Sequence, residues 1–165
     1  MDATYLLKLL KEIQDVMAQN RDYLIDLDRV VGDGDLGLTM SDGFSAAYRA
    51  AKESGETDAG RLLYTAGKAM STAVPSTMGT LMASGIMEGG KAIAGKGEIG
   101  TGELSQFLTG FANGIQKRGK CRLGDRTVLD AADAGAKRAE EAFACGKDMK
   151  AILDAAVEGA KDGVE

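Results

Sequence analysis

Apolar residues recur every three or four positions along almost the whole chain, which is the spacing of amphipathic helices. No stretch shows convincingly the alternation of apolar and polar residues that is typical of a strand. Short clusters rich in glycine, serine or proline interrupt the helical pattern. The pattern predicts about eight helices, over residues 3–18, 21–31, 39–53, 58–73, 77–94, 102–118, 126–144 and 148–162.

The loops between these helices are short, so successive helices are expected to run antiparallel. A chain of 165 residues is long enough for one domain with a proper core and short for two. We therefore expect an all-α fold, an up-and-down antiparallel bundle, in a single domain spanning residues 1–165.

Composition narrows the classes of partner. The 25 acidic and 20 basic residues give a net charge of −5, and no basic stripe or aromatic platform favours nucleic acid. No apolar run approaches the ~18 residues of a membrane span, and a polar helix rather than a signal peptide follows Met1. Cys121 and Cys145 do not have the spacing of a metal site. These features predict a cytoplasmic protein without a nucleic-acid or membrane partner.

Histidine is absent from the chain. Catalysis by a serine or cysteine nucleophile paired with histidine is therefore excluded, and so is transport of a phosphoryl group on histidine. Any general base has to be a carboxylate, a lysine or a metal-bound water.

The most informative segment is the acidic, glycine-rich octet from Gly32 to Thr39. It contains Asp33 and Asp35, and Asp28 lies just upstream. Magnesium prefers oxygen ligands and is usually held by a few carboxylates together with the phosphates of a nucleotide. Glycines allow backbone N–H groups to approach an anion closely. The octet therefore predicts a site for a metal–nucleotide complex.

Three alternatives compete for this octet. Its glycines fit a dinucleotide-binding fingerprint, but the alanine-rich residues 44–53 that follow predict a helix where that fold needs a strand. An EF-hand loop starting at Asp33 would need glutamate at the position of Phe44. The third alternative, an acidic turn that only caps a helix starting near Thr39, stays open.

Two further segments could lie near a phosphate. Ser76 and Thr77 follow the single proline, Pro75, and begin a predicted helix whose free N–H groups could bind phosphate, although most such helix starts are only caps. Residues 118–130 form a turn that leads into a helix, with Asp125 as the expected N-cap.

In their order and spacing the three segments resemble the nucleotide-binding, L-type subunit of dihydroxyacetone kinases, a fold that also forms the C-terminal domain of single-chain kinases. The resemblance covers about residues 5 to 163. It implies an all-α barrel of antiparallel helices that binds ADP or ATP with two magnesium ions at one rim. It also implies phosphoryl transfer, within glycerol metabolism, to dihydroxyacetone or a related ketose held on a separate subunit.

The resemblance assigns roles to individual residues. It implies three magnesium ligands, Asp28, Asp33 and Asp35. It implies a loop that wraps the phosphates, formed by Leu36, Gly37, Leu38 and Thr39. Ser76 and Thr77 match a helix start that faces the phosphates, and Gly119 and Val128 match positions that line the adenine pocket.

The resemblance also implies partners, and this chain departs from the family pattern at two points. The partners are a ketose-binding kinase subunit and, in multi-subunit systems, a phosphoenolpyruvate-dependent phosphocarrier protein that rephosphorylates bound ADP. Leu36 stands where the family often has histidine, and the chain stops at Glu165 where the family continues with a lid segment. The competing interpretation is a non-catalytic binding or regulatory module that has kept the fold. A carboxylate-bridged metal protein fits poorly without histidine.

Overall fold

A computed structural model describes residues 1–164 and confirms the all-α prediction. Its eight helices are α1 (Ala3–Gln19), α2 (Arg21–Asp28), α3 (Leu36–Ser54), α4 (Ala59–Ala73), α5 (Thr77–Ala92), α6 (Thr101–Gly119), α7 (Val128–Ala144) and α8 (Met149–Asp162). The described residues contain no strand, only an isolated antiparallel bridge between Asp2 and Glu98.

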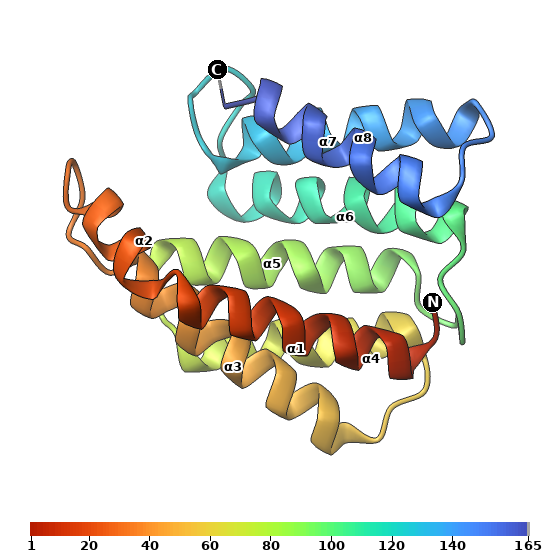
Figure 1. The fold of residues 1–165 in the computed structure, drawn as a ribbon, viewed down its shortest axis with the longest axis horizontal. Coiled ribbons are helices and arrows are strands. Elements are labelled where there is room, and N and C mark those ends of the chain that lie inside the picture. The colour runs from red at the N-terminus through yellow and green to blue at the C-terminus, as the bar shows by residue number, and fades with distance from the viewer. Residues whose placement is uncertain (165) are drawn as a thin grey trace.

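The helices run back and forth and pack mainly on their neighbours in the sequence (Figure 1). From α3 to α8 each helix contacts the next, and α1 and α2 both lie against α3. Helices α1 and α2 meet at Asn20, which ends the first and begins the second, so they form one bent segment. Within residues 1–164, α8 contacts only α6 and α7, so the antiparallel array does not close between α8 and α1.

The core is centred on α4, which lies between α3 and α5. Leu62, Ala66 and Met70 recur at helical spacing on α4 and are completely buried. Burying each of the two large side chains contributes roughly 1.5–3 kcal/mol to folding. The core continues through Leu104 of α6 and Ile152 of α8, which belong to the same contiguous cluster of buried residues as Leu62, Ala66 and Met70.

Glycine explains how closely α5 and α6 approach each other. A Cβ atom added at Gly114 would lie 2.4 Å from the carbonyl oxygen of Ser84, a distance that no side chain tolerates. Some of the 23 glycines of the chain are therefore required for close packing between neighbouring helices.

Two predicted boundaries near the acidic octet are wrong. Helix α2 ends at Asp28 rather than at residue 31, because the next hydrogen bonds span three residues instead of four: Val30 N–H donates to the carbonyl of Leu27 at 3.4 Å and Val31 N–H to that of Asp28 at 3.2 Å. Helix α3 begins at Leu36 rather than Thr39, since the N–H of Thr39 already donates to the carbonyl of Asp35 at 2.9 Å. The octet is therefore a short turn followed directly by a helix.

Helix α7 also begins later than expected, at Val128 rather than residue 126. Arg126 has a φ of 57°, in the left-handed region, so a right-handed helix cannot include it. The N-cap is Thr127, whose side chain accepts from the N–H of Leu129, and not Asp125 as predicted.

The antiparallel order brings the acidic turn and the starts of α3, α5 and α7 to one end of the molecule, on the left in Figure 1. All three segments singled out in the sequence therefore lie at the same end. Among the described residues, no helix is both long and apolar enough to cross a membrane.

Candidate metal–nucleotide site

The three aspartates predicted to bind magnesium come together in the turn between α2 and α3. Asp28 is the last residue of α2, Asp33 lies in the exposed turn, and Asp35 directly precedes α3. One carboxylate oxygen from each lies within 4.8 Å of the others. Three hard oxygen donors at this spacing fit a magnesium ion that keeps some of its waters or binds phosphate oxygens.

Glycine at position 32 permits this arrangement. A Cβ atom there would lie 2.3 Å from a carboxylate oxygen of Asp28 and 2.9 Å from its carbonyl oxygen. The turn also leaves the carboxylates weakly bound to the protein. The N–H of Leu36 lies 3.4 Å from Asp28 Oδ2, and the N–H of Asp35 lies 3.4 Å from Asp33 Oδ1. At these lengths the oxygens remain available to a cation.

The pKa of Asp35 is raised above its ordinary value of 3.8. The largest cause is partial burial, followed by the negative charges of Asp33 and Asp28. A bound cation would remove the repulsion among the three carboxylates, so the geometry and the charge of the turn favour the same kind of ligand.

The capping alternative can be examined at Asp35. This residue occupies the N-cap position of α3, but its side chain accepts no capping hydrogen bond in the described structure. By contrast, Asp58 and Asp148 accept from the N–H groups of Arg61 and Ala151, both at 2.9 Å. Helix capping therefore does not explain the aspartate at position 35.

The segment expected to be a phosphate-wrapping loop, Leu36 to Thr39, is instead the first turn of α3. The N–H groups of Leu36, Gly37 and Leu38 belong to this helix start, where anions bind, whereas that of Thr39 already donates to Asp35. Gly37 is buried against α2, and a Cβ atom there would lie 2.0 Å from the carbonyl oxygen of Arg21. Close contact between the two helices thus gives Gly37 a packing role.

Thr39 links this helix start to the second predicted segment. Its buried hydroxyl donates to Ser76 Oγ at 2.9 Å, and Ser76 in turn caps α5 by accepting from the N–H of Gly79 at 3.0 Å. An open hollow of about 290 Å³ lies over this contact. Its lining includes four of the predicted site residues, Asp35, Leu38, Thr39 and Ser76.

The same hollow contains Asp42, which the sequence reasoning missed. Asp42 lies seven positions after Asp35, and therefore on the same side of α3. That spacing was visible in the sequence, but it becomes informative only once α3 is known to begin at Leu36.

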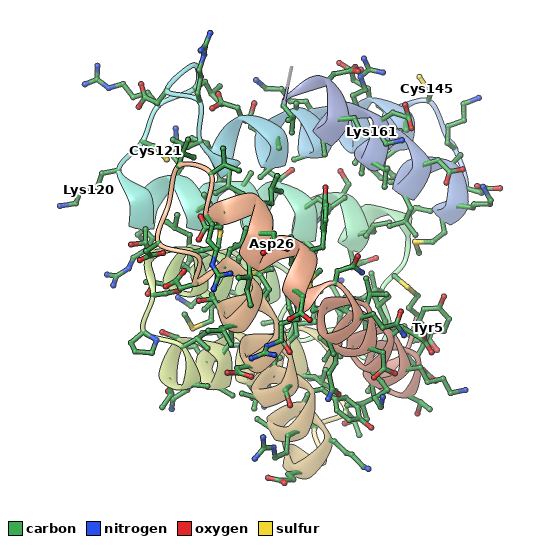
Figure 2. The ribbon with its side chains drawn as sticks, turned by 60° about the vertical axis from the view of Figure 1, so that its left-hand side comes forward. Tyr5, Asp26, Lys120, Cys121, Cys145 and Lys161 are labelled. Atoms are coloured by element: carbon green, nitrogen blue, oxygen red, sulfur yellow. The ribbon has the colours of Figure 1, made fainter. Side chains whose placement is uncertain are left out.

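Thr77, Gly119 and Val128 lie outside the lining of this hollow but at the same end of the molecule. Thr77 is the first residue of α5, Gly119 is the last of α6 and Val128 is the first of α7. Residues 120–127 connect the last two and carry Lys120 and Cys121, both labelled in Figure 2. The predicted adenine-pocket residues thus flank one loop.

Comparison with known proteins shows the family of the chain. The DAK2 domain matches residues 30–165. The chain belongs to the DAK2 domain family. Among DAK2 relatives, the "PEP-dependent dihydroxyacetone kinase 2, ADP-binding subunit DhaL" of Listeria innocua is 33% identical over 133 residues, covering 79% of this chain. The corresponding Escherichia coli subunit is 29% identical over 77% of the chain.

The chain spans 62% of the Listeria relative and 60% of the Escherichia coli relative. It also resembles solved structures of the C. freundii dihydroxyacetone kinase. The structure in complex with AMP-PNP and Mg²⁺ matches 97% of this chain and 29% of that protein, with a TM-score of 0.71 and 21% identity. This likeness supports the DAK2 helical fold.

Proposed function

We propose that this DAK2 chain is the nucleotide-binding component of a dihydroxyacetone-kinase-type phosphotransferase. In this proposal it binds Mg-ADP or Mg-ATP and passes a phosphoryl group to dihydroxyacetone, or a related small ketose, on a partner subunit. The observation that carries it is the cluster of Asp28, Asp33 and Asp35, with carboxylate oxygens within 4.8 Å of one another beside the starts of α3 and α5. The names of the relatives support the same nucleotide and acceptor.

The side chains of the turn would act by holding charge in place. The three carboxylates would hold one or two magnesium ions, which neutralise the negative charge that phosphoryl transfer spreads over oxygen atoms. The N–H groups at the starts of α3 and α5, including those of Leu36, Leu38 and Thr77, would orient the phosphates. Gly119 and Val128 are proposed to border the adenine. No residue of the chain is needed as a covalent nucleophile.

Acceptor and donor come from elsewhere in this proposal. The ketose would be held by a separate kinase subunit. Positioning two reactants can account for ~7–11 kcal/mol of a barrier, so the chain without that subunit is expected to transfer almost no phosphoryl group. Bound ADP would be rephosphorylated by a phosphoenolpyruvate-dependent phosphocarrier, or exchanged for ATP. The relatives named as PEP-dependent kinases favour the phosphocarrier.

One experiment tests the nucleotide and the acceptor together. Thermal melts with ADP plus magnesium should rise above melts with either ligand alone, since a ligand bound only by the native state stabilises it. Triose phosphate should then form from dihydroxyacetone, with either ATP or the phosphorylated phosphocarrier as donor, only after the ketose-binding subunit is added. Absence of any melting synergy at millimolar ligand would support a non-catalytic module, and ketose phosphorylation by the isolated chain would contradict the subunit role.

A further inference from the structure

A polar hollow of about 470 Å³ lies on the solvent-exposed side of α6, between the ends of α5 and α7. We refer to it as the α6 hollow. Its volume is in the range of small-molecule sites, roughly 300–1,000 Å³. The helix ends that border it lie at the end of the molecule opposite to the acidic turn (Figure 1). The side chains that the hollow brings together are those of Ser105, Gln106, Thr109, Asn113, Glu140 and Phe143.

The two glycines of α6 in the lining differ in what they do for the fold. A Cβ atom at Gly110 would lie 2.9 Å from the Cα of Gly89, so close packing of α5 on α6 requires glycine there. A Cβ atom at Gly102 would lie 3.4 Å from the ring of Phe143, which is an ordinary contact. The absence of a side chain at Gly102 leaves the Phe143 ring open to the hollow, and this residue is 42% exposed.

Ser105 is the residue of the hollow that the fold leaves incomplete. Thr39 and Ser105 are the two polar side chains that are buried among the described residues, at 4% and 5% exposure. The Thr39 hydroxyl donates to Ser76 at 2.9 Å, whereas the Ser105 hydroxyl has no hydrogen-bond partner within residues 1–164. The usual alternative in a helix is visible in α5, where the Ser84 hydroxyl donates to the carbonyl of Thr80 at 2.8 Å.

A buried hydroxyl without a partner is unfavourable, so its presence calls for an explanation. The small part of Ser105 that stays exposed faces the α6 hollow, which the residue lines. We therefore expect its hydrogen bond to be made to a molecule in the hollow.

The other polar side chains of the hollow are free as well. Gln106, Thr109 and Asn113 are exposed and make no side-chain hydrogen bond within the part of the chain that the structure describes. Glu140 has no ion-pair partner there, because the two cations that precede it on α7 pair with Asp133 and Asp162. Five polar groups thus converge on one space without serving the fold.

We propose that the α6 hollow binds a small, neutral polyhydroxylated molecule, a polyol or a monosaccharide. This inference goes beyond the proposed function and does not depend on it. The amides of Gln106 and Asn113 each offer donors and an acceptor, which match the hydroxyl groups of such a molecule. The hydroxyl of Ser105 can donate and accept, and the Glu140 carboxylate accepts. The exposed Phe143 ring offers an apolar surface to C–H groups.

The charge of the lining disfavours other ligands. Glu140 is the one charged residue among those that line the hollow in the described structure, so a phosphorylated sugar or a nucleotide would meet a negative charge and no cation. A quaternary ammonium ion could lie against Glu140 and Phe143. It would offer no acceptor to the amides or to Ser105, so a neutral polyol uses more of the site.

The test measures binding of erythritol and glucose to the full chain by saturation-transfer difference NMR, with glucose 6-phosphate and choline as the charged comparisons. Gln106→Leu combined with Asn113→Leu should raise the dissociation constant for glucose about tenfold or more, because two hydrogen-bonding groups are lost. The matched control is Gln116→Leu, at an exposed position of the same helix outside the lining. It should leave the constant nearly unchanged.

Ser105→Ala separates a binding role from a structural one. The apo melting temperature should hold or rise, because the hydroxyl has no partner in the fold, while the dissociation constant for glucose should rise about threefold or more. A lower melting temperature with unchanged glucose binding would contradict the proposal.

Three further outcomes would overturn the site: no transfer signal from either polyol, which would leave water as the occupant, a stronger signal from choline or glucose 6-phosphate than from glucose, or an equal effect of Gln116→Leu. Melts with ADP and magnesium, run on the same variants, report on the proposed function separately. Their response should be unchanged, so failure of one proposal is distinguishable from failure of the other.

Discussion

Two aspartate-containing turns at the same end of the molecule use their carboxylates in opposite ways. In the turn before α7, Asp125 accepts from the N–H of Arg122 at 2.8 Å, and Asp130 accepts from those of Gly124 and Thr127 at 2.6 and 2.8 Å. In the turn before α3, the side-chain oxygens of Asp28 and Asp33 have backbone donors only at 3.4 Å.

The pKa values follow the same division. Hydrogen bonds from the N–H groups of Gly124 and Thr127 lower the pKa of Asp130, whereas partial burial and two neighbouring carboxylates raise that of Asp35. Aspartate at or near a helix start therefore has one of two roles in this chain. Where backbone N–H groups donate to the carboxylate at short distance, the residue shapes a loop. Where several neighbouring carboxylates lack such close donors, they form a candidate cation site.

The largest effect on ligand-dependent stability is expected when two aspartates of a turn are replaced by asparagine, which removes their charge and keeps their shape. Asp33→Asn with Asp35→Asn should abolish stabilisation by ADP plus magnesium, worth about 2.7 kcal/mol at a hundredfold excess of ligand over its dissociation constant. Without ligand, stability should hold or rise because like charges are removed. Thermal melts with and without the ligand pair measure both quantities.

The matched control is Asp125→Asn with Asp130→Asn. An amide has one acceptor oxygen instead of two, so Asp130→Asn cannot satisfy both Gly124 and Thr127, and the apo protein should melt at a lower temperature. Its response to ADP plus magnesium should persist. If the first variant keeps its ligand response, the metal assignment fails.

Alanine at one glycine of each turn should give smaller and different effects. Gly124 has a φ of 89° with open space around it, so Gly124→Ala should cost about 1–2 kcal/mol of unfolding free energy and leave ligand affinity unchanged. Gly32→Ala should displace the Asp28 carboxylate and weaken magnesium-dependent binding. Urea unfolding and nucleotide titration of both variants measure these effects, and equal losses of affinity would contradict the distinction between the turns.

The smallest effects are expected in the pH dependence of apo stability, with opposite signs in the two turns. A raised pKa at Asp35 means that the folded state binds the proton more tightly, so its contribution to stability is present below 3.8 and is lost as pH rises through the folded pKa. Asp35→Asn should therefore gain stability relative to wild type between about pH 4 and pH 7.

The lowered pKa of Asp130 has the reverse consequence. Its contribution is present above the unfolded pKa, whose ordinary value is 3.8, and is lost as pH falls through the folded pKa. The deficit of Asp130→Asn should stay constant between about pH 7 and pH 4 and shrink only below that range. Urea unfolding of both single variants across the range checks the signs, and parallel profiles would contradict them.

Much of the fold was predictable because helical periodicity is a local signal. All eight helices were expected, and the start of α5 at Thr77 was placed correctly because Pro75 and Ser76 are strong start signals. The predicted starts of α3 and α7 were wrong because these starts depend on backbone dihedral angles that the residue types do not reveal. Nothing in the residue type of Arg126 announces its left-handed φ.

For the candidate site, the sequence indicated which aspartates could share a cation, since Asp28, Asp33 and Asp35 are close in the chain. It did not indicate that Thr39 would contact Ser76, because that hydrogen bond joins residues 37 positions apart. It could not show either that the array stays open between α8 and α1, because that depends on how each helix is angled on the next.

The packing of each helix mainly on its neighbours in the chain has a consequence for cooperativity. In such an array, the ends can separate locally without disturbing distant helices, as in repeat proteins. The residues proposed to hold the nucleotide come from every second connection of the chain, those before α3, α5 and α7. A ligand bound by all three would act as a non-covalent crosslink and would make an otherwise sequential assembly unfold as one unit.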